Sequence, residues 1–242
     1  MITKSTTDLS SLDFNSGEII LIDKPFGWSS FKVIYEIRKS ISEKKVGHAG
    51  TLDPAATGLL IVCTGKKTKS ISSFQELAKT YTGSIRLGVT SASMDLETEL
   101  IEIDDLKNIT EAKILSAIKN FTGTIMQIPP MYSAVKVGGK SLYHLARKGK
   151  TVEREPRQIT IYNFKVNKIQ LPEIHFEITC SKGTYIRAIA DDLGKVLGCG
   201  GILSSLRRTK IGTYSVDDAL TVDEFVNNCQ NTTCVSLLEN IL

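Results

Sequence analysis

Residues that build metal centres and disulfide frameworks are scarce in this sequence. Its 242 residues include five cysteines, none in a Cys-x-x-Cys pair, and three histidines, at positions 48, 144 and 175. No two histidines have metal-ligand spacing, so we expect no metal site. An odd number of cysteines without a secretory leader indicates reduced thiols, mostly buried as small hydrophobic side chains.

Long apolar runs and nucleotide-binding signatures are also missing. No run approaches the ~20 residues needed to span a bilayer. The first fifteen residues are polar and rich in Ser and Thr, unlike a signal peptide, so we expect a cytoplasmic protein. No G-x-G-x-x-G follows a strand, and residues 65–67 (GKK) lack the earlier glycine of a P-loop.

The remaining composition is that of a globular protein with unevenly placed charge. Hydrophobic residues make up 41% of the chain and charged residues 23%. The net charge is only +4, yet residues 131–160 carry seven Lys or Arg against two Glu, whereas residues 213–242 carry five acids and no Lys or Arg. The basic segment could meet a polyanion, or each segment could be a solvated face.

Hydrophobic patterns predict helices and strands that are interspersed without a regular βαβ rhythm, which favours an α+β fold. Strands are expected at 18–23, 59–63, 81–89, 157–169, 174–180 and 206–212. A helix capped by Ser29 or Ser30 is expected to bury Phe31, Ile34, Ile37 and Ile41. A helix capped by Thr110 is expected to bury Ile114, Leu115, Ile118 and Phe121 and to close at Gly123. Further helices are expected at 185–197, ended by Gly198, and after a capping box at 221–224.

Residues 127–156 form a long segment of a different kind. The pairs Pro129-Pro130 and Gly138-Gly139 divide it into short pieces, and its charge is strongly positive. It nevertheless keeps apolar and aromatic side chains, among them Met131, Tyr132, Val135, Val137, Leu142, Tyr143 and Leu145. Loops of this length inside a compact domain are usually functional. We interpret the segment as a partly ordered excursion from the core that grips a ligand.

Residues 46–58 (VGHAGTLDPAATG) are predicted to form a shaped loop between apolar segments. Its glycines permit unusual backbone angles, and its proline restricts the preceding residue. Asp53 is the side chain there with the widest chemical range. Composition alone leaves open whether Asp53 is catalytic or bonds its own backbone in an ordinary turn.

Two other glycine turns carry reactive or aromatic polar residues, namely Tyr81 in one and Tyr185 with Arg187 in the other. An aspartate can act as nucleophile or base, an arginine can keep it ionised, and a tyrosine can stack on a base. Equally, the tyrosines could be half-buried aromatics and Arg187 a surface ion pair. Spacing alone cannot bring these stretches together.

Five blocks in the same order resemble the TruB family of tRNA pseudouridine synthases. The signature loop is at 47–58, the N-terminal motif KPFGWSS at 24–30, the start of an RNA-gripping thumb, QIPPMYSA, at 127–134, and the later motifs at 181–187 with 191–194, and at 206–208. The resemblance runs from about residue 19 to 212. It implies a pseudouridine-synthase catalytic fold with a mixed, mostly antiparallel sheet, flanking helices and a thumb-loop insertion.

The resemblance implies isomerisation of uridine-55 in the T-loop of elongator tRNAs to pseudouridine, without cofactor or metal. The N1–C1′ bond breaks and C5 is joined to C1′. Asp53 matches the family's essential aspartate, Arg187 the arginine that pairs with it, and Tyr81 the tyrosine that stacks on the flipped base and is placed to help remove the C5 proton. Which atom Asp53 attacks first is left open.

Five more residues are implied to bind substrate. Tyr185 and Leu206 match residues that line the pocket, and His48 matches the residue that fills the space left by the flipped nucleotide. Asp95 corresponds to an acidic residue near the target loop, and Lys24 belongs to the N-terminal motif.

The resemblance also implies how RNA is held and how the chain is divided. Thumb cations are expected to contact phosphates: Lys136, Lys140, Arg147 and Lys148. We expect a catalytic domain at 1–212, with the thumb at about 127–156. About 30 residues follow Gly212, below the ~40 at which a domain usually folds alone, so a tail packed on the core is expected instead of a PUA domain. The expected partner is the T-arm of tRNA, bound by a monomer without membrane attachment.

Two other functions compete with this interpretation. A non-catalytic RNA-binding or RNA-folding module would keep the fold, but would not need Asp53, Tyr81 and Arg187 together. An Asp-dependent hydrolase or transferase would need a second acid–base group or a phosphate loop, and the sequence has neither.

Overall fold

The computed structural model describes residues 1–6, 8–9, 12–103 and 106–239, with the backbone alone for 231–239. Its contacts divide the chain into two compact units. The first unit comprises Met1–Lys79 and Arg207–Leu242, and the second comprises Thr80–Leu206. No helix in the described part of the chain is long and apolar enough to cross a membrane.

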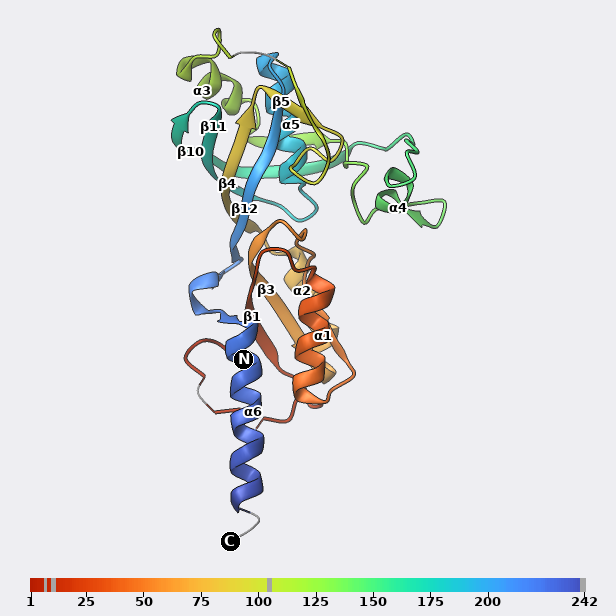
Figure 1. The fold of residues 1–242 in the computed structure, drawn as a ribbon, viewed down its shortest axis with the longest axis vertical. Helices are drawn as coiled ribbons and strands as arrows, with labels where there is room; N and C mark the ends of the chain where they lie inside the picture. The colour runs from red at the N-terminus through yellow and green to blue at the C-terminus, as the bar shows by residue number, and fades with distance from the viewer. Residues whose placement is uncertain (7, 10–11, 104–105, 240–242) are drawn as a thin grey trace. The chain divides into compact units, whose positions relative to one another are not determined.

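The sheet of the first unit is built on two buried strands (Figure 1). β1 (Ile19–Lys24) and β3 (Thr57–Thr64) pair antiparallel, from Ile19 opposite Cys63 to Lys24 opposite Gly58. Both are nearly continuous apolar runs, as strands covered on both faces require. β14 (Leu220–Thr221) pairs with β1, and β2 (Val46–His48) and β12 (Gly201–Ile211) pair with β3. β13 (Tyr214–Ser215) pairs with β12. The strands predicted at 18–23 and 59–63 are confirmed.

Two helices of the first unit cover one face of its sheet and carry the predicted caps (Figure 1). α1 (Ser30–Ile41) starts at Ser29, whose hydroxyl accepts from the Lys32 amide at 3.1 Å. α6 (Val222–Glu239) starts at the capping box, in which Thr221 and Glu224 each accept from the other's amide. They share a core with the strands that includes Ile20, Ile22, Leu60, Val62, Val33, Ile37 and Phe225.

The other face of this sheet is covered by short elements. η1 (Gly65–Ser70) leads into α2 (Ile71–Glu76), and η2 (Val216–Asp218) lies between β13 and β14. Their apolar side chains pack with the strands in a second cluster that includes Leu59, Ile61, Phe74 and Val216. Both faces of β1 and β3 are therefore buried.

In the second unit, the strands lie in a sheet with the order β12-β4-β11-β10-β7. β10 (Arg157–Gln170) pairs antiparallel with both β11 (Glu173–Cys180) and β7 (Gly123–Gln127), and β4 is Lys79–Leu87. β5 (Val89–Ser91) and β6 (Leu100–Glu102) form a separate hairpin. The chain is thus α+β with a mixed, mostly antiparallel sheet, as predicted.

Two helices accompany this sheet, α3 (Glu111–Lys119) and α5 (Ile186–Leu197). The Thr110 hydroxyl caps α3 by accepting from the Lys113 amide at 3.3 Å. α5 buries Ile186, Ile189 and Leu193, and its C-cap is Gly198 with φ 74°, as predicted.

Three details predicted for the helices are wrong. Phe31 is 71% exposed, because the buried face of α1 runs through Val33, Ile34 and Ile37. Leu115 is 40% exposed, because α3 turns it away from Ile114 and Ile118. Gly123 does not close α3, which ends at Lys119 with Asn120 as its C-cap; Gly123 begins β7 with φ 101°.

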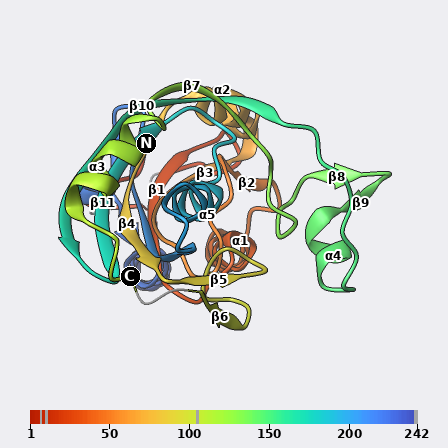
Figure 2. The same cartoon turned by 90° about the horizontal axis from the view of Figure 1, so that it is seen from above.

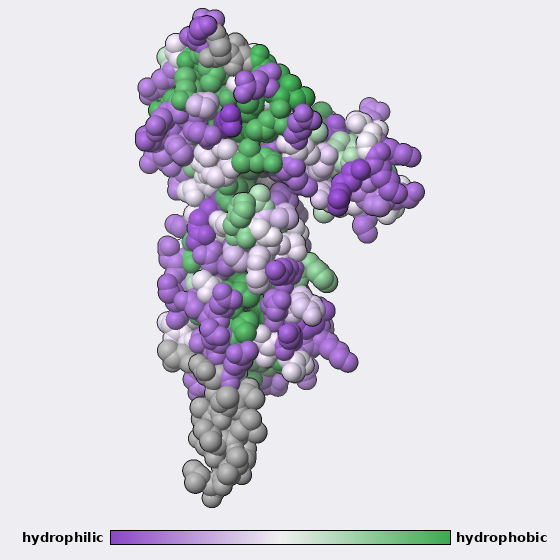
Figure 3. All heavy atoms as spheres, in the orientation of Figure 1, coloured by the Kyte–Doolittle hydropathy of each residue, from purple (hydrophilic) through white to green (hydrophobic). Residues whose placement is uncertain are grey.

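The segment predicted as an excursion stands apart from the remainder of the second unit (Figure 2). It contains the hairpin of β8 (Lys136–Val137) and β9 (Lys140–Ser141), followed by α4 (Leu142–Ala146). Most of its visible surface is hydrophilic (Figure 3). We call residues 127–156 the thumb segment.

Candidate active site

The loop between β2 and β3 is shaped by contacts at both of its ends. Gly50 and Gly58 have φ values of 101° and 104°, which favour glycine. The Ser30 hydroxyl accepts from the Leu52 amide and donates to the Leu52 carbonyl. The Ala56 amide bonds the Asp53 carbonyl at 3.0 Å. This fixed backbone holds Asp53 half-buried, in the middle of the loop.

Lys24 stabilises the same loop from β1. Its side chain is fully buried, and its Nζ donates to the carbonyls of Trp28 at 2.6 Å, Pro25 at 2.9 Å and Pro54 at 3.4 Å. Burial lowers the pKa of Lys24 to about 8, although the nearby Asp53 carboxylate favours the charged ammonium. The structure therefore gives Lys24 backbone partners beside Asp53, whereas direct substrate contact stays a prediction.

His48 ends β2 at the start of the loop. Its Nδ1 is buried and has no hydrogen-bond partner among the described residues. Burial, then the positive charge of Arg208, lowers the pKa of His48 below 6.5, against an opposing interaction with the Gly50 backbone. Its surroundings thus favour the neutral form of the imidazole.

Two successive arginines of β12, Arg207 and Arg208, have different partners. Arg207 forms a two-pronged ion pair with Asp23, with Nη1–Oδ1 and Nη2–Oδ2 distances of 3.0 and 2.6 Å. Arg208 is 1% exposed and donates to the carbonyls of Leu59 at 2.7 Å and Gly50 at 3.1 Å. The sequence did not identify Arg208 as a site residue. A signal was nevertheless present, because adjacent side chains of a strand point to opposite faces, so either Arg207 or Arg208 had to point into the protein.

The second unit holds Arg187 in a buried polar network. Its Nε lies 3.5 Å from Asp95 Oδ2, and both side chains are less than one-tenth exposed. Its guanidinium also donates to the carbonyls of Ser93 at 3.1 Å and Tyr132 at 2.8 Å. Arg187 is therefore no surface ion pair, and Asp95 is its partner within this unit. Asp53 belongs to the other unit, so its pairing with Arg187 stays a prediction.

The other pocket residues predicted from the family motifs also belong to the second unit. Tyr185 precedes α5, and its backbone amide and carbonyl are both bonded by the Gln127 side chain, at 2.8 and 3.1 Å. Tyr81 lies on β4 and is 9% exposed, while Leu206 on β12 is half-buried. Gln127 was not predicted as a positioning residue, because its contact with Tyr185 depends on packing between distant segments.

The thumb segment is tied to this network through aromatic side chains. The Tyr143 hydroxyl donates to Glu97 at 3.0 Å, and its ring meets that of Tyr132 edge-on at 5.9 Å. The Tyr143 pKa is raised, mainly by its hydrogen bond to Glu97. All four predicted thumb cations are exposed: Lys136, Lys140, Arg147 and Lys148. They are thus available to a polyanion.

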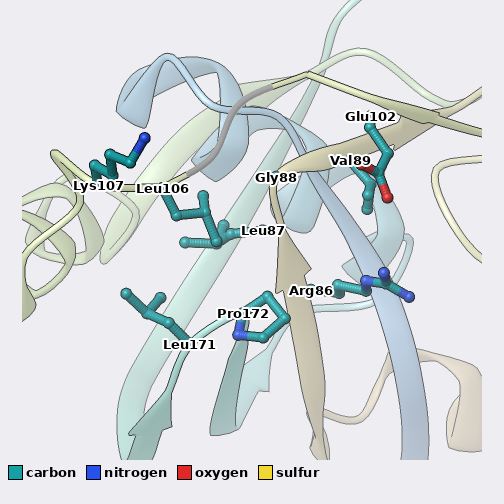
Figure 4. Close-up of a pocket in the computed structure, with 9 residues that line it drawn as sticks. All are labelled: Arg86, Leu87, Gly88, Val89, Glu102, Leu106, Lys107, Leu171 and Pro172. Atoms are coloured by element: carbon teal, nitrogen blue, oxygen red, sulfur yellow. The ribbon is translucent and has the colours of Figure 1, made fainter.

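A separate pocket of about 410 Å³ lies at the β4–β5 turn, near the β10–β11 turn (Figure 4). Leu87, Leu106 and Leu171 line one side of it, and Arg86 and Glu102 lie on the other. None of the predicted site residues lines this pocket.

Comparison with protein families identifies the family to which the chain belongs. A model described as TruB family pseudouridylate synthase (N terminal domain) matches residues 38–186. A second, described as tRNA pseudouridylate synthase B C-terminal domain, matches residues 187–242. The chain belongs to the TruB family. The family assignment from the five motifs is confirmed.

TruB relatives match nearly end to end. The tRNA pseudouridine synthase B of Flavobacterium johnsoniae is 46% identical over 225 residues, covering 90% of this chain and 98% of the relative. That of Chlorobaculum tepidum is 50% identical over 216 residues, covering 87% and 90%. Among solved structures, a chain of a Cbf5–Nop10–Gar1 complex matches with a TM-score of 0.69 and 30% identity, over 88% of this chain. This TruB chain spans 54% of that solved chain.

Proposed function

We propose that this chain isomerises uridine-55 in the T-loop of elongator tRNAs to pseudouridine, without a metal or cofactor. The observation that carries the proposal is the fixed loop that presents Asp53, in a chain of the TruB family whose relatives are named tRNA pseudouridine synthase B.

The reaction balances without a co-reactant. The N1–C1′ bond breaks, the base turns, C5 bonds to C1′, the C5 proton leaves and N1 gains a proton. Asp53 is proposed as the essential carboxylate, and Arg187 as its cationic partner. Tyr81 would stack on the base and help to remove the C5 proton.

Access to the base requires that uridine-55 leave its stack, at a cost of a few kcal/mol. The neutral ring of His48 would fill the vacated space, while Tyr185 and Leu206 would line the pocket. Exposed thumb cations would bind the phosphates, and the shape of the loop would then select the RNA. Residues 1–212 would form the catalytic domain, with 213–242 as a tail on its core.

The direct test is incubation with an unmodified tRNA transcript, followed by mapping of pseudouridine at each position. We expect product at position 55 only. A chain that binds the transcript and leaves every uridine unchanged would be a binding or folding module, contrary to the proposal.

The role of Asp53 is tested by Asp53→Asn. This change removes the carboxylate but keeps nearly the same size, so we expect product formation to fall at least ~10⁴-fold while tRNA affinity stays within about threefold. Asp218→Asn, which changes an exposed acid in η2, serves as the control and should keep wild-type turnover. Normal turnover by Asp53→Asn would contradict the assignment.

A further inference from the structure

We propose that Arg208 is a positioning residue that sets the conformation of the Asp53 loop for catalysis. The inference rests on the proposed function, and it adds a residue that does not itself touch the substrate.

Arg208 bonds the chain on both sides of Asp53. Its Nη2 donates to Gly50, three residues before Asp53, and its Nε donates to Leu59, six residues after it. One planar guanidinium thus spans the loop with donors fixed relative to each other. A lysine carries a single ammonium in place of that rigid fork, so it cannot reproduce both contacts in the same geometry.

The backbone beneath Arg208 is equally constrained. Arg208 pairs with Gly58 where β12 runs parallel to β3. A Cβ on Gly58 would lie 2.3 Å from the Arg208 carbonyl oxygen and 2.7 Å from its amide nitrogen. Strand and loop therefore meet at a distance that only glycine permits, which brings the guanidinium to the two carbonyls.

The charge of Arg208 acts on the same loop. Burying a cation is costly unless it is hydrogen-bonded, and here its charge lowers the pKa of both His48 and Lys24. Arg208 thus favours the neutral imidazole next to the loop that it holds. The effects of hydrogen-bond geometry and of charge can be measured separately by substituting Arg208. Lysine retains the positive charge without the planar guanidinium, and methionine retains neither.

The experiment compares Arg208→Lys and Arg208→Met with Arg207→Lys. Arg207→Lys keeps an ion pair with Asp23 and should keep kcat within about twofold. We expect Arg208→Lys to retain its Tm within a few degrees and its KM within threefold, while kcat falls about 100-fold, the order expected when a reacting group is displaced by about 1 Å. The pKa of His48, followed by NMR, should stay low in Arg208→Lys and rise towards 6.5 in Arg208→Met.

Several results would overturn the inference. A folded Arg208→Lys with wild-type kcat would do so, and so would loss of tRNA affinity in proportion to loss of kcat. If both variants unfold, Gly50→Ala tests the loop conformation itself, because an alanine is strained at the φ of 101° found there. Wild-type kcat in Gly50→Ala would show that catalysis does not depend on this conformation and would contradict the inference. If the wild type forms no pseudouridine, the proposed function fails. The NMR shifts of the loop amides of residues 50–53 in Arg208→Lys then still test whether Arg208 holds the loop, and unchanged shifts would reject it.

Discussion

At the scale of single residues, ionisation around the Asp53 loop depends on which charges are buried. Arg208 and Lys24 bring two cations to a loop with one carboxylate, and each bonds backbone carbonyls. Charge-assisted bonds to carbonyls fix the backbone more strongly than neutral ones. Burial, followed by the charge of Arg208, lowers the pKa of the nearby His48.

The depressed pKa of His48 makes a defined contribution to stability. Near and below pH 6.5 His48 binds a proton more readily in the unfolded chain than in the folded protein, where its pKa is lower. The free energy of unfolding therefore falls as pH decreases through that range. We expect His48→Asn to lose less stability than the wild type between pH 7.5 and 5.5, measured by urea denaturation. His175→Asn, at an exposed histidine, should behave like the wild type. An equal loss in wild type and His48→Asn would contradict the prediction.

At the scale of elements, helix starts are fixed by hydrogen bonds that the sequence already indicates. The Thr221 hydroxyl accepts from the Glu224 amide at 3.1 Å, and the Glu224 carboxylate accepts from the Thr221 amide at 2.8 Å. The second bond lowers the pKa of Glu224. α6 places Val222 and Phe225 in the core of the first unit, so this cap supports tertiary packing as well.

Loss of the cap should be measurable. We expect Thr221→Ala to reduce the free energy of unfolding by about 1 kcal/mol, since the Glu224 amide loses its partner. Urea denaturation measures the change, and Thr213→Ala, at an exposed threonine in the preceding turn, is the matched control. Equal stability of the two variants would show that the cap contributes nothing.

The elements that the sequence predicted well are those with local signals. Caps at Ser29, Thr110 and Thr221 depend on neighbouring residues, so they are visible in the sequence. The exposed Phe31 was mispredicted because the same helix also carries Val33, and periodicity alone did not say which of the two faces the sheet. That choice depends on packing against distant strands.

At the scale of the whole molecule, site residues come from segments far apart in sequence, and this limits prediction. The motifs selected Asp95 and Arg187 separately, whereas their ion pair depends on a fold that brings positions 92 residues apart (187 minus 95) together. The inward turn of Arg208 required the pairing of β12 with β3, which no local pattern specifies.

The uneven charge of the molecule predicts a salt-dependent interaction with tRNA. Replacing Lys136, Lys140 and Lys148 together with alanine should weaken binding and reduce the slope of log K against log salt by about 2, if each contacts one phosphate. Filter binding at several KCl concentrations measures this slope. The control replaces three exposed lysines of the same unit away from the thumb segment, Lys119, Lys165 and Lys168, and should leave the slope unchanged. A thumb variant with the wild-type slope would exclude phosphate contacts by these lysines.

Strand β12 also restricts how this chain can change in evolution. Leu206, Arg207 and Arg208 are consecutive, and the last two are held in register opposite Thr57 and Gly58. Inserting or deleting one residue before Arg208 would turn every later side chain of the strand to the opposite face of the sheet. The Arg208 guanidinium would then no longer reach the Asp53 loop. Changes in the length of this strand should therefore be eliminated by selection. Natural variation in length is therefore expected in the turns outside β12.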